Sequence, residues 1–238
     1  MDTTRFTHPI DFHAVSITDP FWQRETELVR REVIPYQWDA LNDRIPGAEK
    51  SWCMHNFRLA GRIMAQYRQQ GAQYTPQAYT YRGYDALPDD PAHPDEDKFY
   101  GFVFQDTDFS KWIEAVGYSL IQHPDEALEA TAEAIDVVCA AQTPEGYLDT
   151  YYIINGMDGV FQNLRDHHEL YCLGHLIEGA VSYYQATGKD KLLRAACRFA
   201  DYVADFFGTA DGQCKGYPGH EIAEMALVRL YEVTQDEK

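Results

Sequence analysis

The chain has 238 residues, of which 45% are hydrophobic and 24% charged, a composition typical of a globular protein with one large core or two small ones. Its formal net charge of −18 predicts repulsion from phosphate backbones and anionic lipids, so we expect neither a nucleic acid nor a membrane as partner. No stretch approaches the roughly 20 apolar residues of a membrane span, and the polar residues 1–20 lack the apolar segment of a signal peptide, which predicts a cytoplasmic protein.

The first part of the chain predicts two helices followed by a long loop. Residues 22–42 carry a loose apolar stripe, and Pro35 should kink or divide the helix that they form, because proline has no backbone N–H. Residues 52–70 predict a second helix. Residues 73–97 are polar and contain four prolines, which predicts a loop, either a lid or a disordered segment.

Helical periodicity becomes regular after residue 99, with turns rich in Gly, Pro and Asp between the helices. The helices predicted in this part span residues 108–121, 125–141, 168–186, 190–207 and 219–234. Strand-like patterns are confined to residues 101–105 and 147–154. We therefore expect an all-α fold.

An internal repeat indicates how these helices are arranged. A shift of 65 residues places Tyr118 on Tyr183 and aligns two helix–turn–helix units, and a third unit begins where Tyr231 echoes Tyr184. Stacked helical hairpins bury their faces against their neighbours, so the unpaired last helix predicts either a fragment or assembly with another chain. We expect the helical hairpins of an incomplete (α/α)6 toroid.

In such a toroid the N-terminal ends of the inner helices meet at one rim, and His175 and His220 are the strongest candidates for a site there. They precede the shared Tyr-x-x-Thr elements at Tyr184 and Tyr231 by nine and eleven residues, so they occupy nearly equivalent places in consecutive units. A neutral imidazole both donates and accepts a hydrogen bond, which suits sugar hydroxyls. The competing interpretation is a pair of core or capping histidines.

Acidic residues of the same rim offer further candidates. Asp106 and Asp108 have the spacing of paired carboxylates for acid–base chemistry. Asp108 is better explained as the N-cap of the helix that follows, which leaves Asp106 and Gln105 as the candidate ligand contacts.

We expect no metal site within this chain. His167 and His168 are adjacent, so they point in different directions on a helix, and the H-E-x-x-H motif is absent. The cysteines are odd in number and widely spaced without a C-x-x-C pair, which argues against a disulfide framework or zinc ribbon. Three of them, Cys139, Cys172 and Cys197, fall in apolar helical stretches and are interpreted as core residues.

Six motifs in order along the chain resemble those of a known family. They are Pro20–Trp22, Ile34–Trp38, Phe104–Trp112, Gly146–Thr150, His168–Tyr171 with Gly174 and His175, and Gly219–Glu221. The sequence resembles the N-terminal part of glycoside hydrolase family 127, the β-L-arabinofuranosidases. The resemblance covers nearly the whole chain, with residues 73–97 as an insertion.

The resemblance implies a retaining hydrolase on an (α/α)6 barrel that releases β-L-arabinofuranose, with residues 1–238 as the N-terminal portion of the catalytic domain. It further implies a zinc-bound cysteine thiolate as nucleophile and a glutamate as acid/base, and it places the two sugar-contacting histidines at His175 and His220. The cysteine and glutamate motifs of the family are not found in residues 1–238, and none of the five cysteines matches them. We therefore expect zinc and catalysis in the full-length enzyme, and a small carbohydrate ligand but no activity in this chain alone.

Two other classes of function remain open at this point. One is another sugar enzyme of the α/α-toroid type, an epimerase or an unsaturated uronyl hydrolase, which would use His or Asp at the same rim without zinc. The other is a non-catalytic helical-repeat binding protein, which would bind a protein surface and no sugar.

Overall fold

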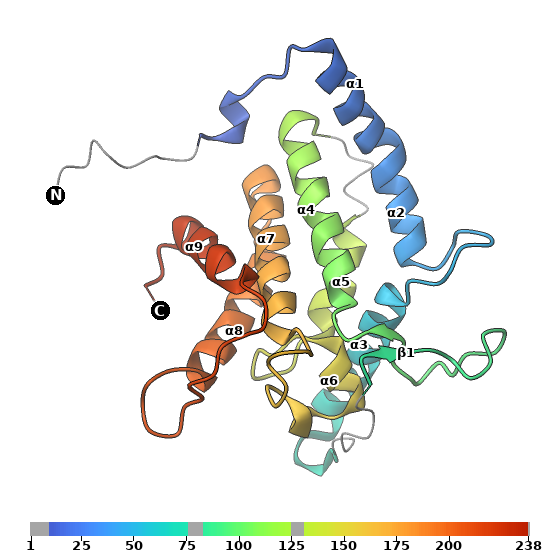
Figure 1. Cartoon of the computed structure of the whole chain (residues 1–238), viewed down its shortest axis with the longest axis vertical. Helices are drawn as coiled ribbons and strands as arrows, with labels where there is room; N and C mark the ends of the chain where they lie inside the picture. Colours follow the sequence, from blue (N-terminus) through green and yellow to red (C-terminus); the bar gives the residue numbers. More distant parts are fainter. Residues whose placement is uncertain (1–9, 76–82, 125–130, 238) are drawn as a thin grey trace.

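The computed structural model describes residues 10–75, 83–124 and 131–237, and these residues form helices and one short sheet (Figure 1). The all-α prediction is confirmed. The elements in chain order are η2 (Phe12–Ala14), α1 (Pro20–Leu28), the π-helical η3 (Val29–Val33), α2 (Ile34–Leu41), α3 (Cys53–Gln70), η4 (Gly71–Gln73), β1 (Asp85–Ala86), β2 (Gly101–Phe102), α4 (Asp106–Gln122), α5 (Thr131–Ala141), α6 (Thr150–Asn155), η6 (Met157–Gly159), α7 (Glu169–Thr187), α8 (Lys191–Phe206) and α9 (Ile222–Thr234). The first six residues of the helix predicted over 125–141 lie outside the described residues.

The predicted first helix is divided where the sequence indicated. Asp19 caps α1 by accepting hydrogen bonds from the backbone N–H groups of Phe21 and Trp22. The hydrogen-bond ladder then widens into the π-helical η3, which ends two residues before Pro35, a residue of the first turn of α2. Because proline has no N–H to donate, the α-helical register is easily lost at this position.

The helices lie in two rows. One row is formed by α2, α4, α7 and α9, with α7 between α4 and α9, and α3, α5 and α8 pack behind it (Figure 1). Two glycines allow α4 and α7 to approach closely: a Cβ atom at Gly117 would lie 2.7 Å from the Ser182 carbonyl carbon, and one at Gly179 would lie 2.6 Å from the Ser110 carbonyl oxygen. The toroid itself stays a prediction.

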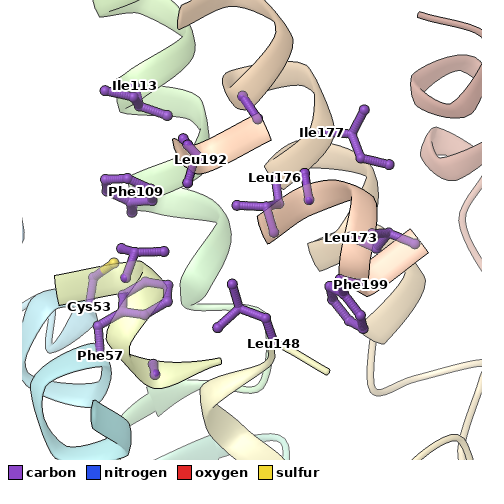
Figure 2. Packing of buried hydrophobic residues seen from close by; sticks show 14 of the residues in the cluster. Cys53, Phe57, Phe109, Ile113, Leu148, Leu173, Leu176, Ile177, Leu192 and Phe199 are labelled. Carbon is purple, nitrogen blue, oxygen red and sulfur yellow. The ribbon is translucent and has the colours of Figure 1, made fainter. Parts of the chain in front are cut away.

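The core fills the space between the two rows. Phe109 and Ile113 of α4 face Leu173, Leu176 and other apolar residues of α7 in the cluster that Figure 2 shows. Cys172 is buried in this region, as expected for a core residue. Cys139 and Cys197 are only half-buried, although they pack against the same core.

Both strand predictions need correction. Residues 147–154 form the turn before α6 and most of that helix, where the Asp149 carboxylate accepts a hydrogen bond from the Tyr151 N–H at 3.0 Å. A short apolar run that is buried on all sides has the same sequence pattern in a helix and in a strand. The segment 101–105 is a strand only over its first two residues, which pair antiparallel with β1 in the predicted loop.

None of the helices that the structure describes has the length and apolar character needed to cross a bilayer.

Candidate functional site

The two candidate histidines both contact the same tyrosine. The Tyr171 ring centroid is 4.4 Å from that of His175, one turn further along α7, and 4.6 Å from that of His220, in the segment before α9. The N–H of Gly219 donates to the Leu164 carbonyl at 3.1 Å, which fixes the His220 segment against the loop that leads into α7. The structure thus brings together the two histidines that the sequence repeat had paired.

Lys111 completes this group from the neighbouring helix α4. Its ammonium donates hydrogen bonds to Tyr171 Oη at 3.0 Å and to Thr107 Oγ1 at 3.1 Å. Burial, followed by the charges of Lys111 and His220, lowers the pKa of His175 to about 4. His175 is therefore a neutral imidazole at neutral pH, and its buried Nδ1 has no hydrogen-bond partner among the described residues.

His168 borders the group and contacts Tyr171. Its ring centroid is 5.6 Å from Tyr171 and 6.5 Å from His220. The backbone at His168 is left-handed, with φ of 59°, and Nδ1 lies 2.6 Å from the Asp166 carbonyl oxygen. A carbonyl only accepts, so Nδ1 carries the hydrogen and Nε2 is an acceptor in the neutral ring.

Sequence reasoning missed Lys111, His168 and Tyr171 as members of the site. A usable signal exists for two of them, because residues 168, 171 and 175 are spaced three and four apart and therefore share one face of a helix. Lys111 belongs to a different helix, so only the packing of α4 on α7 brings it to the site.

Asp106 and Gln105 hold the structure around the site together. The buried Asp106 carboxylate accepts hydrogen bonds from the Thr150 N–H at 2.7 Å and the Thr150 hydroxyl at 2.5 Å, which joins α4 to α6. Burial raises the pKa of Asp106 to about 6. Gln105 accepts from the Phe102 N–H at 3.1 Å and donates to Asp108 at 2.6 Å. Their role as ligand contacts stays a prediction.

The prediction that Asp108 caps α4 is wrong. The helix begins at Asp106, with Gln105 in the N-cap position, so Asp108 lies inside the first turn. Its carboxylate accepts the side-chain amide of Gln105 instead of a backbone N–H of the helix start.

Two buried carboxyl groups, those of Glu169 and Asp149, lie near the start of α7, next to the site. Burial raises the pKa of Glu169, the first residue of α7, to about 8. Its carboxyl accepts hydrogen bonds from Tyr147 Oη at 2.7 Å and from the Phe161 N–H at 2.8 Å. Burial and the charge of Asp106 also raise the pKa of Asp149. These groups tie the segment before α7 to the core and so fix His168, which directly precedes Glu169.

An ion-pair network lies further along the same helices. Arg229 of α9 forms an ion pair with Glu178 of α7, donates to Tyr118 Oη at 3.1 Å and lies 4.0 Å from Glu114 of α4. Glu178 follows His175 by three residues, so both side chains belong to one face of α7. The network therefore connects α4 and α7, which carry Lys111 and His175, to α9, the helix that follows the His220 segment.

The residues present do not fit a zinc ion. Within the described ranges, no three His, Cys, Asp or Glu side chains are grouped as metal ligands would be. Burial raises the pKa of the Cys53, Cys139, Cys172 and Cys197 thiols, which opposes the thiolate form that binds a metal.

The site thus consists of a neutral imidazole, aromatic rings and a lysine gathered near the N-terminal ends of α4, α7 and α9 in an all-α domain. Comparison with known families assigns it: residues 14–238 match the family described as β-L-arabinofuranosidase, GH127 catalytic domain. The chain belongs to this family, and the resemblance seen in the sequence is confirmed.

Individual relatives agree with this assignment. The chain is 36% identical over 231 residues to the non-reducing end β-L-arabinofuranosidase of Bifidobacterium longum subsp. longum, covering 94% of this chain and 32% of the relative. A crystal structure of a GH127 β-L-arabinofuranosidase from Geobacillus stearothermophilus T6 matches with a TM-score of 0.77 and 45% identity, over 94% of this chain and 30% of that one. A second solved GH127 β-arabinofuranosidase matches with a TM-score of 0.75 and 33% identity, over 96% of this chain and 32% of that one. The chain thus spans about a third of the length of these relatives.

Proposed function

We propose that this chain is the part of a retaining β-L-arabinofuranosidase that binds the terminal sugar, with residues 1–238 as the N-terminal portion of one (α/α)6 catalytic domain. The family membership and the names of the relatives support the substrate class. The two helix rows support the toroid, with α2, α4, α7 and α9 as inner helices and α3, α5 and α8 as outer ones.

The observation that carries the proposal is the neutral His175 beside Tyr171 and His220. The neutral imidazole of His175 can donate a hydrogen bond to a sugar hydroxyl and accept one from it, and the ring of Tyr171 beside it offers an apolar wall. His220 is exposed and its ring lies 4.6 Å from the same Tyr171 ring, so one small sugar ring can contact all three side chains. Binding and orientation, not bond cleavage, are the roles assigned to these side chains.

The family membership favours this function over an epimerase or a uronyl hydrolase. A non-catalytic role as a protein-binding helical repeat makes a different prediction, because such a protein would have no affinity for a furanoside.

Calorimetry on the purified chain tests the proposal with methyl β-L-arabinofuranoside and with its D-enantiomer as control ligand. We expect binding of the L-furanoside, and a loss of about three- to tenfold in affinity for His175→Ala, the effect of one hydrogen bond. His123→Ala, which removes an exposed histidine after α4, is the matched control and should bind as the wild type does. Absence of binding by the folded wild-type chain, or equal affinity of His175→Ala, would reject the proposed site.

A further inference from the structure

Three aromatic side chains form an exposed surface beside the histidines. The rings of Phe102 and Phe104 are stacked, with centroids 5.3 Å apart and planes inclined by 2°. The Tyr84 ring lies 6.1 Å from Phe102 and 5.7 Å from Phe104. Tyr84 and Phe102 remain 46% and 43% exposed. We call these three residues the aromatic shelf.

The backbone holds Tyr84 in place on both sides. Its carbonyl accepts a hydrogen bond from the Val103 N–H at 3.0 Å. The carbonyl of the preceding Gly83 accepts from Tyr151 Oη at 3.1 Å. The backbone that carries the exposed Tyr84 ring is therefore held to the core by hydrogen bonds. Ligand binding does not have to order this segment first.

Phe102 is fixed in a similar way. It pairs with Asp85 in the two-stranded sheet, and its N–H donates to Gln105 Oε1. Gly101 has a φ of 87°, and a Cβ atom there would lie 2.5 Å from the same Gln105 oxygen. This turn thus needs glycine, and it presents the Phe102 ring to solvent at the start of α4.

The shelf is continuous with the proposed sugar site through His168. The His168 ring centroid is 5.3 Å from Phe104 and 6.2 Å from Tyr84. The same His168 ring lies 5.6 Å from Tyr171 and 6.5 Å from His220. A ligand whose terminal ring contacts His175 and His220 therefore extends over His168 toward the shelf.

We infer that the aromatic shelf is a second sugar subsite, which binds the glycosyl ring on the other side of the glycosidic bond. This inference rests on the proposed function. A single exposed aromatic side chain is common on a protein surface and indicates no ligand. Several exposed rings in contact, next to polar groups that can bind a ligand, are typical of a binding surface. Aromatic faces bind the C–H faces of sugar rings, and their lack of charge suits a neutral saccharide. All three shelf residues lie outside the helices, so the shelf sets the preference for the second sugar ring while His175 and Tyr171 of α7 hold the first.

Calorimetry with two ligands tests the shelf: methyl β-L-arabinofuranoside and a disaccharide with the same terminal β-L-arabinofuranosyl ring. We expect the wild type to bind the disaccharide about tenfold more tightly, and Tyr84→Ala and Phe102→Ala to lose most of that advantage while binding the monosaccharide unchanged. Leu87→Ala, which removes an exposed apolar side chain just beyond β1, is the control and should behave as the wild type.

The outcomes separate the two ideas. Wild type that binds both ligands equally, or variants that weaken both by the same factor, would overturn the shelf and leave the terminal-sugar site intact. Binding of neither ligand by the folded wild type would reject the proposed function and the shelf with it. The wild-type comparison needs no substitution, so a variant that fails to fold does not affect the decision.

Discussion

Lys111 and Tyr171 meet across the two central helices, with the ammonium 3.0 Å from the phenol oxygen and 5.0 Å from the centre of the ring. One cation thus contacts both the polar and the apolar part of the tyrosine that both histidines contact. The pair links the electrostatics of the site to the packing of α4 on α7.

Replacing Lys111 by Met should raise the pKa of His175 from its depressed value. Burial is the first cause of the depression and stays, but the second cause, the nearby positive charge, is removed. NMR titration of the imidazole signals checks this, with Lys98→Met, an exposed lysine in a different segment, as control. An unchanged His175 titration in Lys111→Met would contradict the geometry described for this pair.

Replacing Glu169 by Gln should flatten the dependence of stability on pH. The folded-state pKa of about 8 lies above the ordinary value of 4.5, so the carboxyl group keeps its proton in the folded chain after the unfolded chain has released it. The stabilisation that this bound proton gives the folded chain is complete below pH 4.5 and is lost as the pH rises toward 8. The free energy of unfolding falls by on the order of a few kcal/mol over this range.

Chemical denaturation of wild type and Glu169→Gln between pH 5 and 8, a range chosen from the pKa shift, measures the effect. The neutral amide keeps an acceptor for Tyr147 and does not titrate in this range. The stability of the variant relative to the wild type should therefore increase as the pH rises. A constant difference between the two proteins across this range would show that Glu169 does not hold a proton in the folded state.

Replacing Arg229 by Met should destabilise the chain strongly. It leaves the Glu178 and Glu114 carboxylates without their cation in a half-buried environment, and breaking a buried pair on one side costs about 3–5 kcal/mol. Arg194→Met, which breaks the exposed ion pair with Asp190, is the control and should cost less than about 1 kcal/mol.

Urea denaturation gives both values. If Arg229→Met proved as mild as Arg194→Met, the network would not hold α9 against α4 and α7. Adding Glu178→Gln to Arg229→Met should recover part of the loss, because the amide removes one of the two stranded charges.

The helices could be predicted from the sequence because their signal is local. The helices expected over 52–70 and 168–186 are found at Cys53–Gln70 and Glu169–Thr187. Burial of every third or fourth residue repeats along one segment, so no knowledge of distant contacts is needed. The pairing of His175 with His220 could be predicted from the internal repeat, because equivalent positions in stacked units lie side by side.

The features that could not be predicted depend on contacts between segments. Whether residues 147–154 form a strand or a helix depends on their complete burial, and α6 is fixed by a hydrogen bond from Thr150 to Asp106, far away in sequence. The capping role expected of Asp108 was lost to its contact with Gln105. The aromatic shelf joins a residue of the predicted loop to two residues that precede α4, and no spacing rule relates them.

The π-helical turn of η3 has a consequence for the phase of the helix around it. A π turn accommodates one residue more than an α turn, and each residue rotates the chain by about 100°. The side chains of α1 are thereby turned away from the direction set by α2. Ile34 and Leu41 of α2 are buried, whereas α1 contains no buried residue and exposes Phe21 and Trp22. The extra residue therefore offsets the side-chain rows of α1 from those of α2 along a continuous run of helical turns.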